Sequence, residues 1–261
     1  MSVLLLTATI NSGYFGNIST KITDTAERKN QYADTLEKYI CESNFDKIVF
    51  AENSCERLDE EYFMQKANQY NKKLEFLSLP GNKSLMKLKG KSYGEAKLIS
   101  EAIANSKLIK EEQAFYKVTG RVWISNINKL INDRVENNFV AHNFKSWVLT
   151  SFFKIRKDDF YNCLIDAAEL CDDNTENYEW CIEHVYYECL KKAMYPVETF
   201  LVYPDLRGIN SGSGAPYTKS SKALWIRNVI TKNKGYKMDC RNHGYYIVLK
   251  KIEELRIFLR K

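Results

Sequence analysis

Two cations and a glycine follow a short apolar run near the middle of the chain. Residues 115–118 are aromatic and β-branched, which predicts a buried strand, and Lys117, Thr119, Gly120 and Arg121 mark its end. Glycine permits a turn and a close approach, and the two cations attract an anion. Open α/β sheets place ligands at such strand ends. We therefore expect an anion site here, although for these residues alone solvated charges are the simpler interpretation.

Polar side chains also end two predicted strands nearer the N-terminus, over residues 3–9 and 47–50. Because parallel strands bring their carboxyl ends to one edge of a sheet, these side chains are candidates for contacts to the base and ribose of a nucleotide. Ordinary strand-end capping is the alternative. The residues are Thr7, Thr9, Glu52 and Asn53.

Two glycine-containing segments are candidates for phosphate binding. Residues 87–95 read as a basic glycine loop that leads into a helix, so that its backbone N–H groups and lysines face a phosphate. Residues 211–214 read as a lid, because glycines permit closure and a lid excludes water. Solvated, flexible loops are the alternative for both. The candidates are Lys91, Gly94, Glu95, Ser211, Gly212 and Ser213.

The elements around these residues alternate between strand and helix through the first half of the chain. This alternation predicts an α/β fold with a mostly parallel sheet, flanked by helices on right-handed crossovers. The predicted order is a strand at 3–9, a helix capped by Asp24, a strand at 47–50, a helix opening at Asp59, a strand at 74–79, a helix after 95 and the strand at 115–118.

The second half has a different character. Residues 137–155 are aromatic and rich in β-formers, and helices are predicted over 160–170 and 178–192. Residues 218–261 form a basic extension, and its last part, 245–261, has the pattern of a basic amphipathic helix. Such a helix either packs on the domain or touches an anionic bilayer.

Composition excludes several classes of protein. The 261 residues are 44% hydrophobic and 28% charged, typical of a globular protein, and no stretch is long enough for a membrane span. The net charge of +6 suits an anionic substrate or membrane face, and no nucleic-acid-binding motif is present. Neither a GxxxxGK[ST] loop nor a GxGxxG after the first strand occurs, which disfavours a P-loop NTPase or a dinucleotide enzyme.

The seven cysteines predict free thiols. Their number is odd, their spacing is irregular, and no signal peptide precedes them, which together indicate a reducing cytosol. Cys181, His184 and Cys189 form a possible zinc set only at first sight, because Cys189 falls in an apolar helical stripe.

Several segments together resemble the small GT-A-type glycosyltransferases encoded among bacterial capsule and O-antigen genes. No segment is specific by itself, but the set keeps the family's order over residues 4–217. The matching segments are Leu-Leu-Leu-Thr-Ala-Thr-Ile (4–10), Asp24 to Arg28 with Gln31-Tyr32, Ile-Val-Phe-Ala-Glu-Asn-Ser (48–54), Lys-Gly-Lys-Ser-Tyr-Gly-Glu (89–95), Tyr-Lys-Val-Thr-Gly-Arg (116–121), Ile-Glu-His-Val-Tyr-Tyr (182–187) and Gly-Ile-Asn-Ser-Gly-Ser-Gly (208–214).

The resemblance implies a GT-A-like, Rossmann-type sheet over residues 1–217, with a nucleotide-sugar-binding half (1–130), an acceptor and catalytic half (131–217), and a helical C-terminal portion with the extension 218–261. Many such enzymes hold the diphosphate through Mn²⁺ or Mg²⁺ on an Asp-x-Asp motif. This chain has no Asp-x-Asp, and Thr119-Gly120-Arg121 stands in its place. We expect Arg121 to do part of the metal's work, which leaves dependence on a divalent metal in doubt.

The resemblance also points to Glu183 and His184 as the catalytic pair. Glu183 lies one position off the apolar stripe of its predicted helix, so it can face a cleft beside the core. An inverting sugar transfer needs one carboxylate to take the proton of the acceptor hydroxyl. His184 either assists or binds phosphate, with a structural histidine as the alternative. Asp172 and Asp173 are weaker candidates in an acidic turn.

These residues predict a cytoplasmic enzyme that moves a hexose from a nucleotide-diphosphate sugar, a UDP sugar by preference, to a hydroxyl of a growing capsule, O-antigen or lipooligosaccharide. The acceptor would be a glycan or lipid-linked glycan, with peripheral contact at the inner membrane left open and no nucleic-acid partner. The alternatives are a nucleotidyltransferase, although residues 11–19 lack its basic loop, and a non-catalytic module that binds a nucleotide or anionic glycan.

Overall fold

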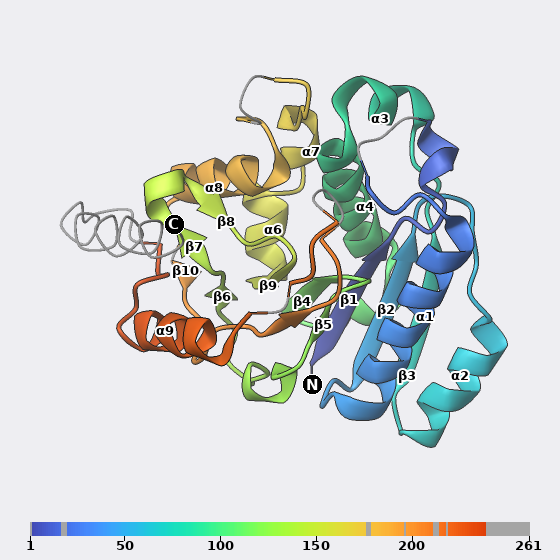
Figure 1. Cartoon of the computed structure of the whole chain (residues 1–261), viewed down its shortest axis with the longest axis horizontal. Coiled ribbons are helices and arrows are strands. Elements are labelled where there is room, and N and C mark those ends of the chain that lie inside the picture. The colour runs from blue at the N-terminus through green and yellow to red at the C-terminus, as the bar shows by residue number, and fades with distance from the viewer. Residues whose placement is uncertain are drawn as a thin grey trace.

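One seven-stranded sheet runs through the molecule, with helices on both of its faces (Figure 1). The computed structural model describes residues 2–16, 20–175, 179–195, 197–210, 214–217 and 219–238. The strand order is β10-β6-β9-β4-β1-β2-β3. The predicted α/β class with a mostly parallel central sheet is confirmed.

The four strands that the first half contributes to this sheet are those that the sequence predicts, and all are parallel. They are β1 (Val3–Ala8), β2 (Lys47–Glu52), β3 (Lys73–Ser78) and β4 (Ala114–Thr119). In register, Leu6 lies beside Phe50 of β2 and Val118 of β4. Their polar ends therefore meet at one edge, as expected for parallel strands.

The second half of the chain extends this sheet through a strand of opposite direction. β9 (Phe152–Arg156) is antiparallel to β4, and β6 (Asn137–Asn138) and β10 (Val197–Glu198) follow it. Two small antiparallel sheets complete the strands: β5 (Trp123–Ile124) with β11 (Leu206–Arg207), and β7 (Ala141–His142) with β8 (Trp147–Val148). The two proposed halves, 1–130 and 131–217, thus share one sheet.

Alternate residues of the central strands supply two cores. Val3 and Leu5 belong to the core under α4 (Lys91–Asn105), α7 (Ala167–Leu170) and α8 (Ile182–Ala193), whereas Leu4 and Leu6 belong to the core under α1 (Thr25–Glu42) and α2 (Glu60–Gln69). This two-sided burial explains why residues 3–6 are apolar without alternation.

Capping side chains start the helices of the first half. Asp24 accepts from the Glu27 amide (2.7 Å) at α1 (Thr25–Glu42), and Asp59 accepts from the Tyr62 amide (3.0 Å) at α2 (Glu60–Gln69). Both predicted starts are confirmed. Further short helical elements are η1 (Ser12–Phe15), α5 (Lys107–Lys110) and η2 (Ile127–Lys129) in the first half and η3 (Asn143–Lys145) in the second.

The predicted glycine loop over residues 87–95 is wrong. Two helices, α3 (Lys83–Lys89) and α4 (Lys91–Asn105), meet at Gly90, whose φ of 92° suits glycine. Gly94 is inside α4, where an added Cβ would lie 2.2 Å from Met86 Cε of α3. This glycine therefore lets two helices pack closely.

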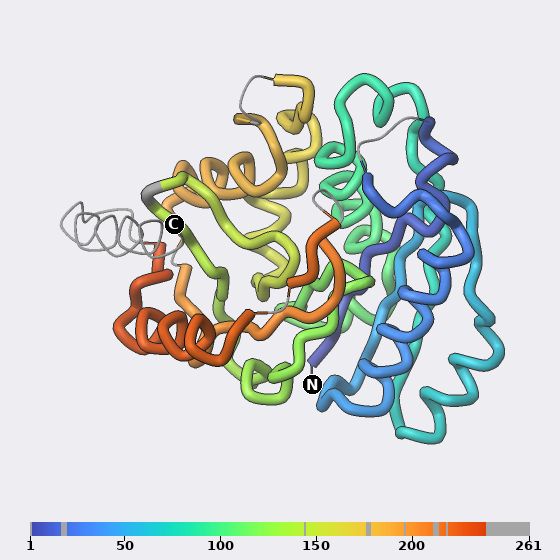
Figure 2. The backbone as a smooth tube through the Cα atoms, in the orientation of Figure 1, coloured from blue at the N-terminus to red at the C-terminus, as the bar shows by residue number. Residues whose placement is uncertain are grey.

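The helices of the second half differ from the prediction in their bounds. The helix expected over 160–170 is split into α6 (Lys157–Cys163) and α7 (Ala167–Leu170), and the one expected from residue 178 begins later, as α8 (Ile182–Ala193). The chain then runs back past the central strands. The last helix among the described residues, α9 (Ser221–Lys232), lies at the periphery (Figure 2). The amphipathic helix predicted over 245–261 lies outside the described residues. None of the described helices is long and apolar enough to cross a membrane.

Gly120 fixes the turn at the end of β4. Its amide donates to the Thr7 carbonyl (2.8 Å), so the chain leaves β4 while still bonded to β1. A Cβ on Gly120 would lie 2.8 Å from that same carbonyl oxygen and 3.1 Å from the Tyr32 ring. Only glycine fits between a neighbouring backbone and a buried ring.

We expect Gly120→Ala to lower the free energy of unfolding by about 1–3 kcal/mol, because the obstructing atom is backbone and cannot move without breaking the β1–β4 contact. Gly94→Ala is the matched control: its obstruction is the mobile end of Met86, and helix propensity favours alanine, so its change should stay within about 1 kcal/mol. Urea denaturation measures both. A Gly120→Ala protein as stable as the Gly94→Ala protein would contradict this account.

Candidate active site

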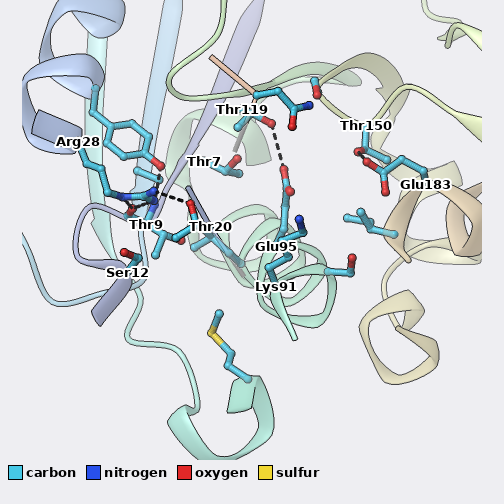
Figure 3. A pocket seen from close by; sticks show the side chains of 18 of the residues that line it. Thr7, Thr9, Ser12, Thr20, Arg28, Lys91, Glu95, Thr119, Thr150 and Glu183 are labelled. Carbon is cyan, nitrogen blue, oxygen red and sulfur yellow. Dashed lines mark hydrogen bonds between the residues drawn. The ribbon is translucent and has the colours of Figure 1, made fainter. Parts of the chain in front are cut away.

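A polar pocket opens at the carboxyl ends of β1 and β4. Side chains from the first turns of α4, from the segment just before β9 and from the start of α8 close it (Figure 3). Its polar lining consists of Thr7, Thr9, Ser12, Thr20, Arg28, Tyr32, Lys91, Ser92, Glu95, Thr119, Thr150, Ser151, Glu183, Asn210 and Tyr217. The pocket therefore lies where the sheet topology predicts a ligand.

Glu95 is held by a buried ion pair. Lys117 has no exposed surface and points from β4 toward α4, where its Nζ pairs with Glu95 Oε1 and also donates to the Thr150 carbonyl (2.9 Å) and Thr119 Oγ1 (3.1 Å). Thr119 Oγ1 in turn donates to Glu95 Oε1 (3.1 Å). Because a buried ammonium needs such partners, Lys117 fixes the Glu95 carboxylate at the pocket wall.

Glu183 supplies a second carboxylate, from the first turn of α8. Thr150 Oγ1 donates to its Oε1 (3.2 Å), and both side chains face the cavity in Figure 3. Burial raises the pKa of Glu183, and the nearby Glu95 carboxylate raises this pKa further. The pocket thus combines one carboxylate paired with a lysine and one whose ionised form is disfavoured, an arrangement typical of acid–base chemistry.

Arg28 of α1 is the guanidinium that lines the pocket. Its Nε donates to the carbonyls of Thr9 and Ile10 (both 3.0 Å), and its Nη1 donates to the Ile22 carbonyl (3.1 Å) and Thr20 Oγ1 (3.4 Å). Burial lowers the pKa of its guanidinium, yet an arginine stays charged at neutral pH. In the described part of the chain no carboxylate forms an ion pair with Arg28; backbone carbonyls stabilise it, and the Glu52 carboxylate attracts it from a greater distance.

The cations expected at the tip of β4 lie elsewhere. Arg121 is buried, donates to Gln31 Oε1 (2.8 Å), lies 5.7 Å over the Tyr32 ring, and is not among the lining residues. Lys117 forms a buried ion pair with Glu95. The expectation that these two residues present free charge to an anion is therefore corrected: the chain turns at Gly120 and carries Arg121 toward α1, and Arg28 occupies the position toward the cavity.

Four other predicted donor-binding residues line the pocket, namely Thr7, Thr9, Lys91 and Thr119, and their contact with a donor stays a prediction. Glu52 does not: its carboxylate accepts from the amides of Ile10 (3.0 Å), Ser54 (2.9 Å) and Glu56 (3.1 Å), and so holds the loops after β1 and β2 together. Asn53 accepts from Thr9 Oγ1 (2.8 Å) and supports that residue from behind the lining.

The remaining candidate residues do not line the pocket, make structural hydrogen bonds, or lie outside the described residues. His184 follows Glu183 on α8 but is not a lining residue. Asp172 accepts from the Asn174 amide (2.9 Å), and Asp173 accepts from the Ser92 amide (2.9 Å) at the start of α4, so it acts as a cap. Ser211, Gly212 and Ser213 lie outside the described residues, although Asn210 and Tyr217, which flank them, both line the pocket.

Sequence reasoning missed several lining residues. Arg28 and Tyr32 lie in the segment that carries the family resemblance, one helical turn apart, and this spacing on a capped helix was the available signal. Thr150 and Ser151 lie just before a strand, where the predicted sheet gave no reason to place a site. For Tyr217, the only signal in the sequence was its position beside the glycine segment. Burial raises the pKa of its hydroxyl.

The described residues contain no group of three or more His, Cys, Asp or Glu side chains arranged to hold a metal ion. The pocket's two carboxylates come from different helices, and one of them is already paired with Lys117.

The chain matches no protein-family model and no curated protein. Among solved structures it is similar to a Desulfovibrio desulfuricans G20 protein named as a nucleotide-diphospho-sugar transferase, with 13% identity and a TM-score of 0.48 over 92% of this chain and 100% of that one. It is also similar to the nucleoside-diphosphate-sugar pyrophosphorylase of Vibrio cholerae RC9, with 12% identity and a TM-score of 0.41 over 75% of this chain and 89% of that one. Identities this low concern the fold alone.

Lys117→Met should lower the free energy of unfolding by about 3 kcal/mol, because it leaves the half-buried Glu95 carboxylate without its partner and removes the hydrogen bonds of the buried ammonium. Glu95→Gln should also lower the free energy of unfolding, because it leaves the buried Lys117 ammonium without its carboxylate partner. The double variant should lose less stability than the sum of the two single losses. The partly exposed pair Lys66–Glu37 is the control, since its coupling should be below about 1 kcal/mol. Additive losses at Lys117 and Glu95 would show that the two side chains do not stabilise each other.

Glu183→Gln should raise the melting temperature at neutral pH. Because folding raises the pKa of Glu183, its ionisation favours the unfolded chain, and this penalty grows as pH rises above the ordinary value of 4.5. Below that value both states are protonated and the penalty is absent. The gain over the natural protein should therefore be larger at about pH 8 than at about pH 4. A gain that does not change with pH would mean that burial does not perturb this carboxyl.

Proposed function

We propose that this chain is a glycosyltransferase that moves a sugar from a nucleotide diphosphate to a hydroxyl group. The observation that carries the proposal is the placement of Glu183, a carboxylate with a raised pKa, in the same pocket as Glu95 and Arg28 at the carboxyl ends of β1 and β4. A pocket with a base at one wall and, at another, a cation that forms no ion pair suits the transfer of a group that leaves an anion behind.

Glu183 acts as the base. The acceptor hydroxyl attacks the anomeric carbon, the new C–O bond forms as the bond from that carbon to the phosphate oxygen breaks, and the hydroxyl proton passes to the Glu183 carboxylate. The leaving electron pair goes to the nucleoside diphosphate. A raised pKa makes Glu183 a stronger base than an ordinary glutamate, and Thr150 orients it. Direct attack by the acceptor gives inversion at the anomeric carbon.

Arg28 is the fixed cation that faces the diphosphate, in the role that the sequence suggested for Arg121. The hydroxyls of Thr9 and Thr20 lie beside Arg28, and Lys91 at the start of α4 is a further cation that lines the pocket. Glu95 is a poor neighbour for a diphosphate, because like charges repel. We therefore assign it to the sugar, whose hydroxyl groups can donate hydrogen bonds to its carboxylate.

The finer assignment follows the family resemblance. The donor is a UDP-linked hexose, the acceptor is a surface glycan of a bacterium, either capsule, O-antigen or lipooligosaccharide, and the enzyme works in the cytoplasm. His184 is not assigned a catalytic role, since it does not line the pocket. If Arg28 replaces a metal ion, donor binding should need no Mn²⁺ or Mg²⁺.

A thermal-shift screen of nucleotide-sugars, with and without Mn²⁺, should identify the donor by a rise in melting temperature. With that donor, Glu183→Gln should reduce transfer by about 10²–10⁴-fold and leave the shift nearly unchanged. Glu188→Gln is the matched control, because Glu188 lies on the same helix with an exposed side chain.

Unchanged transfer by the Glu183→Gln protein would exclude Glu183 as the base. Release of pyrophosphate from a nucleoside triphosphate and a sugar phosphate would instead identify a nucleotidyltransferase. Binding of a donor with neither reaction would favour a non-catalytic binding module.

A further inference from the structure

Helix α9 presents an apolar stripe to solvent. Its inner face is fixed to the body of the molecule: Asn228 Oδ1 accepts from the Tyr203 amide (2.8 Å), Arg227 donates to the Tyr203 hydroxyl, and Thr231 is buried. Because these contacts fix the rotation of the helix, the opposite face must point outward. Figure 1 shows α9 at the periphery, away from α1 and α2.

The outward face carries Trp225, Ile226 and Val229, which are 66%, 37% and 38% exposed. Lys222 and Lys232, both exposed, lie at its two ends. The spacing 222, 225, 226, 229, 232 places all five side chains on one face of a helix. A tryptophan left two-thirds in water on a structured helix is unusual, because burial of its ring would be strongly favourable.

The sequence segment that carries this face has charge of one sign, and of its cations Arg207 pairs with Asp205 and Lys237 with Glu198, outside the segment. Residues 206–238 contain seven lysines and arginines and no aspartate or glutamate, the nearest acids in sequence being Asp205 and Asp239. Across the whole chain, by contrast, 39 cations are accompanied by 33 acids. The basic excess of the protein is therefore concentrated on the segment that carries the exposed tryptophan.

We propose that the outward face of α9, formed by Lys222, Trp225, Ile226, Val229 and Lys232, binds the surface of an anionic lipid bilayer. Tryptophan favours the boundary between headgroups and acyl chains, and lysines at the ends of an apolar stripe reach the lipid phosphates while their stems lie along the apolar surface. Attraction to anionic lipid adds to the burial of the apolar stripe.

A second copy of the chain fits this face less well. In an antiparallel contact of two α9 helices, Lys222 of one copy would approach Lys232 of the other, and the segment offers no acid to neutralise either. Cores of protein interfaces are also depleted in lysine. A bilayer of anionic lipid meets both requirements, an apolar interior for Trp225 and negative charge for the two lysines.

Binding by this face goes beyond the proposed transfer reaction and does not depend on it. The two are close in the chain, since Tyr217 lines the pocket and α9 begins at Ser221. A protein attached to a membrane through α9 would therefore hold its pocket near that membrane.

Sedimentation with vesicles tests the proposal on the full chain. The natural protein should bind phosphatidylglycerol-rich vesicles at least about tenfold more tightly than pure phosphatidylcholine vesicles, and high salt should weaken this binding. Trp225→Ser and the double variant Lys222→Glu/Lys232→Glu should each weaken binding to the anionic vesicles by at least about tenfold. All variants keep residues 233–261, so any contribution of that tail is constant.

Matched controls are Leu88→Ser, which removes an equally exposed apolar side chain (66%) from α3, and Lys38→Glu/Lys87→Glu, which reverses two exposed lysines elsewhere. They should bind like the natural protein, and thermal denaturation checks that every variant folds. Undiminished binding by the α9 variants would overturn the proposal. So would a dimer in solution that Trp225→Ser dissociates, because the face would then be an interface between copies.

Discussion

The ion pair between Lys117 and Glu95 is the interaction on which the geometry of the pocket depends. An ammonium without any exposed surface is stable only when it is paired and fully hydrogen-bonded, and here β4, α4 and Thr150 of the segment before β9 all contribute to that requirement. The same contacts that satisfy Lys117 also set the position of Glu95. Because the Glu95 carboxylate accepts hydrogen bonds from Lys117 and Thr119, two side chains of β4 fix the position of one pocket wall.

The two carboxylates of the pocket differ because their surroundings differ. Glu95 has a lysine beside it, whereas Glu183 has a threonine hydroxyl and the charge of Glu95, and burial raises its pKa. The positive charge lies at another wall, where Arg28 is held by backbone carbonyls. A ligand that is anionic at one end and donates hydrogen bonds at the other matches this distribution, and a nucleotide-sugar has that character.

The sequence predicts the sheet well because its central strands are buried on both faces and therefore read as unbroken apolar runs. Residues 3–6 and 115–118 illustrate this, and the caps at Asp24 and Asp59 are equally local signals. The site is harder to predict, because the direction of a side chain depends on turns. Gly120 carries Arg121 toward α1 instead of the cavity, and Gly94 and Gly90, which read as a loop, instead let two helices meet. Arg28 reaches the pocket only because α1 packs beside β1, a tertiary fact that no local pattern contains.

The direction of β9 has a further consequence. In a wholly parallel sheet, every side chain at the ligand-binding rim follows a strand, and the rim can be altered only by lengthening the loops that lead away from it. Since β9 runs the other way, Thr150 and Ser151 reach the rim before their strand begins. The rim is thus assembled from chain that is leaving the sheet and chain that is entering it. Substitutions of the Thr150 and Ser151 side chains can therefore reshape one wall, because the bonds that join these residues to the end of β4, from Lys117 to the Thr150 carbonyl (2.9 Å) and from the Thr119 amide to the Ser151 carbonyl (3.1 Å), are accepted by the backbone.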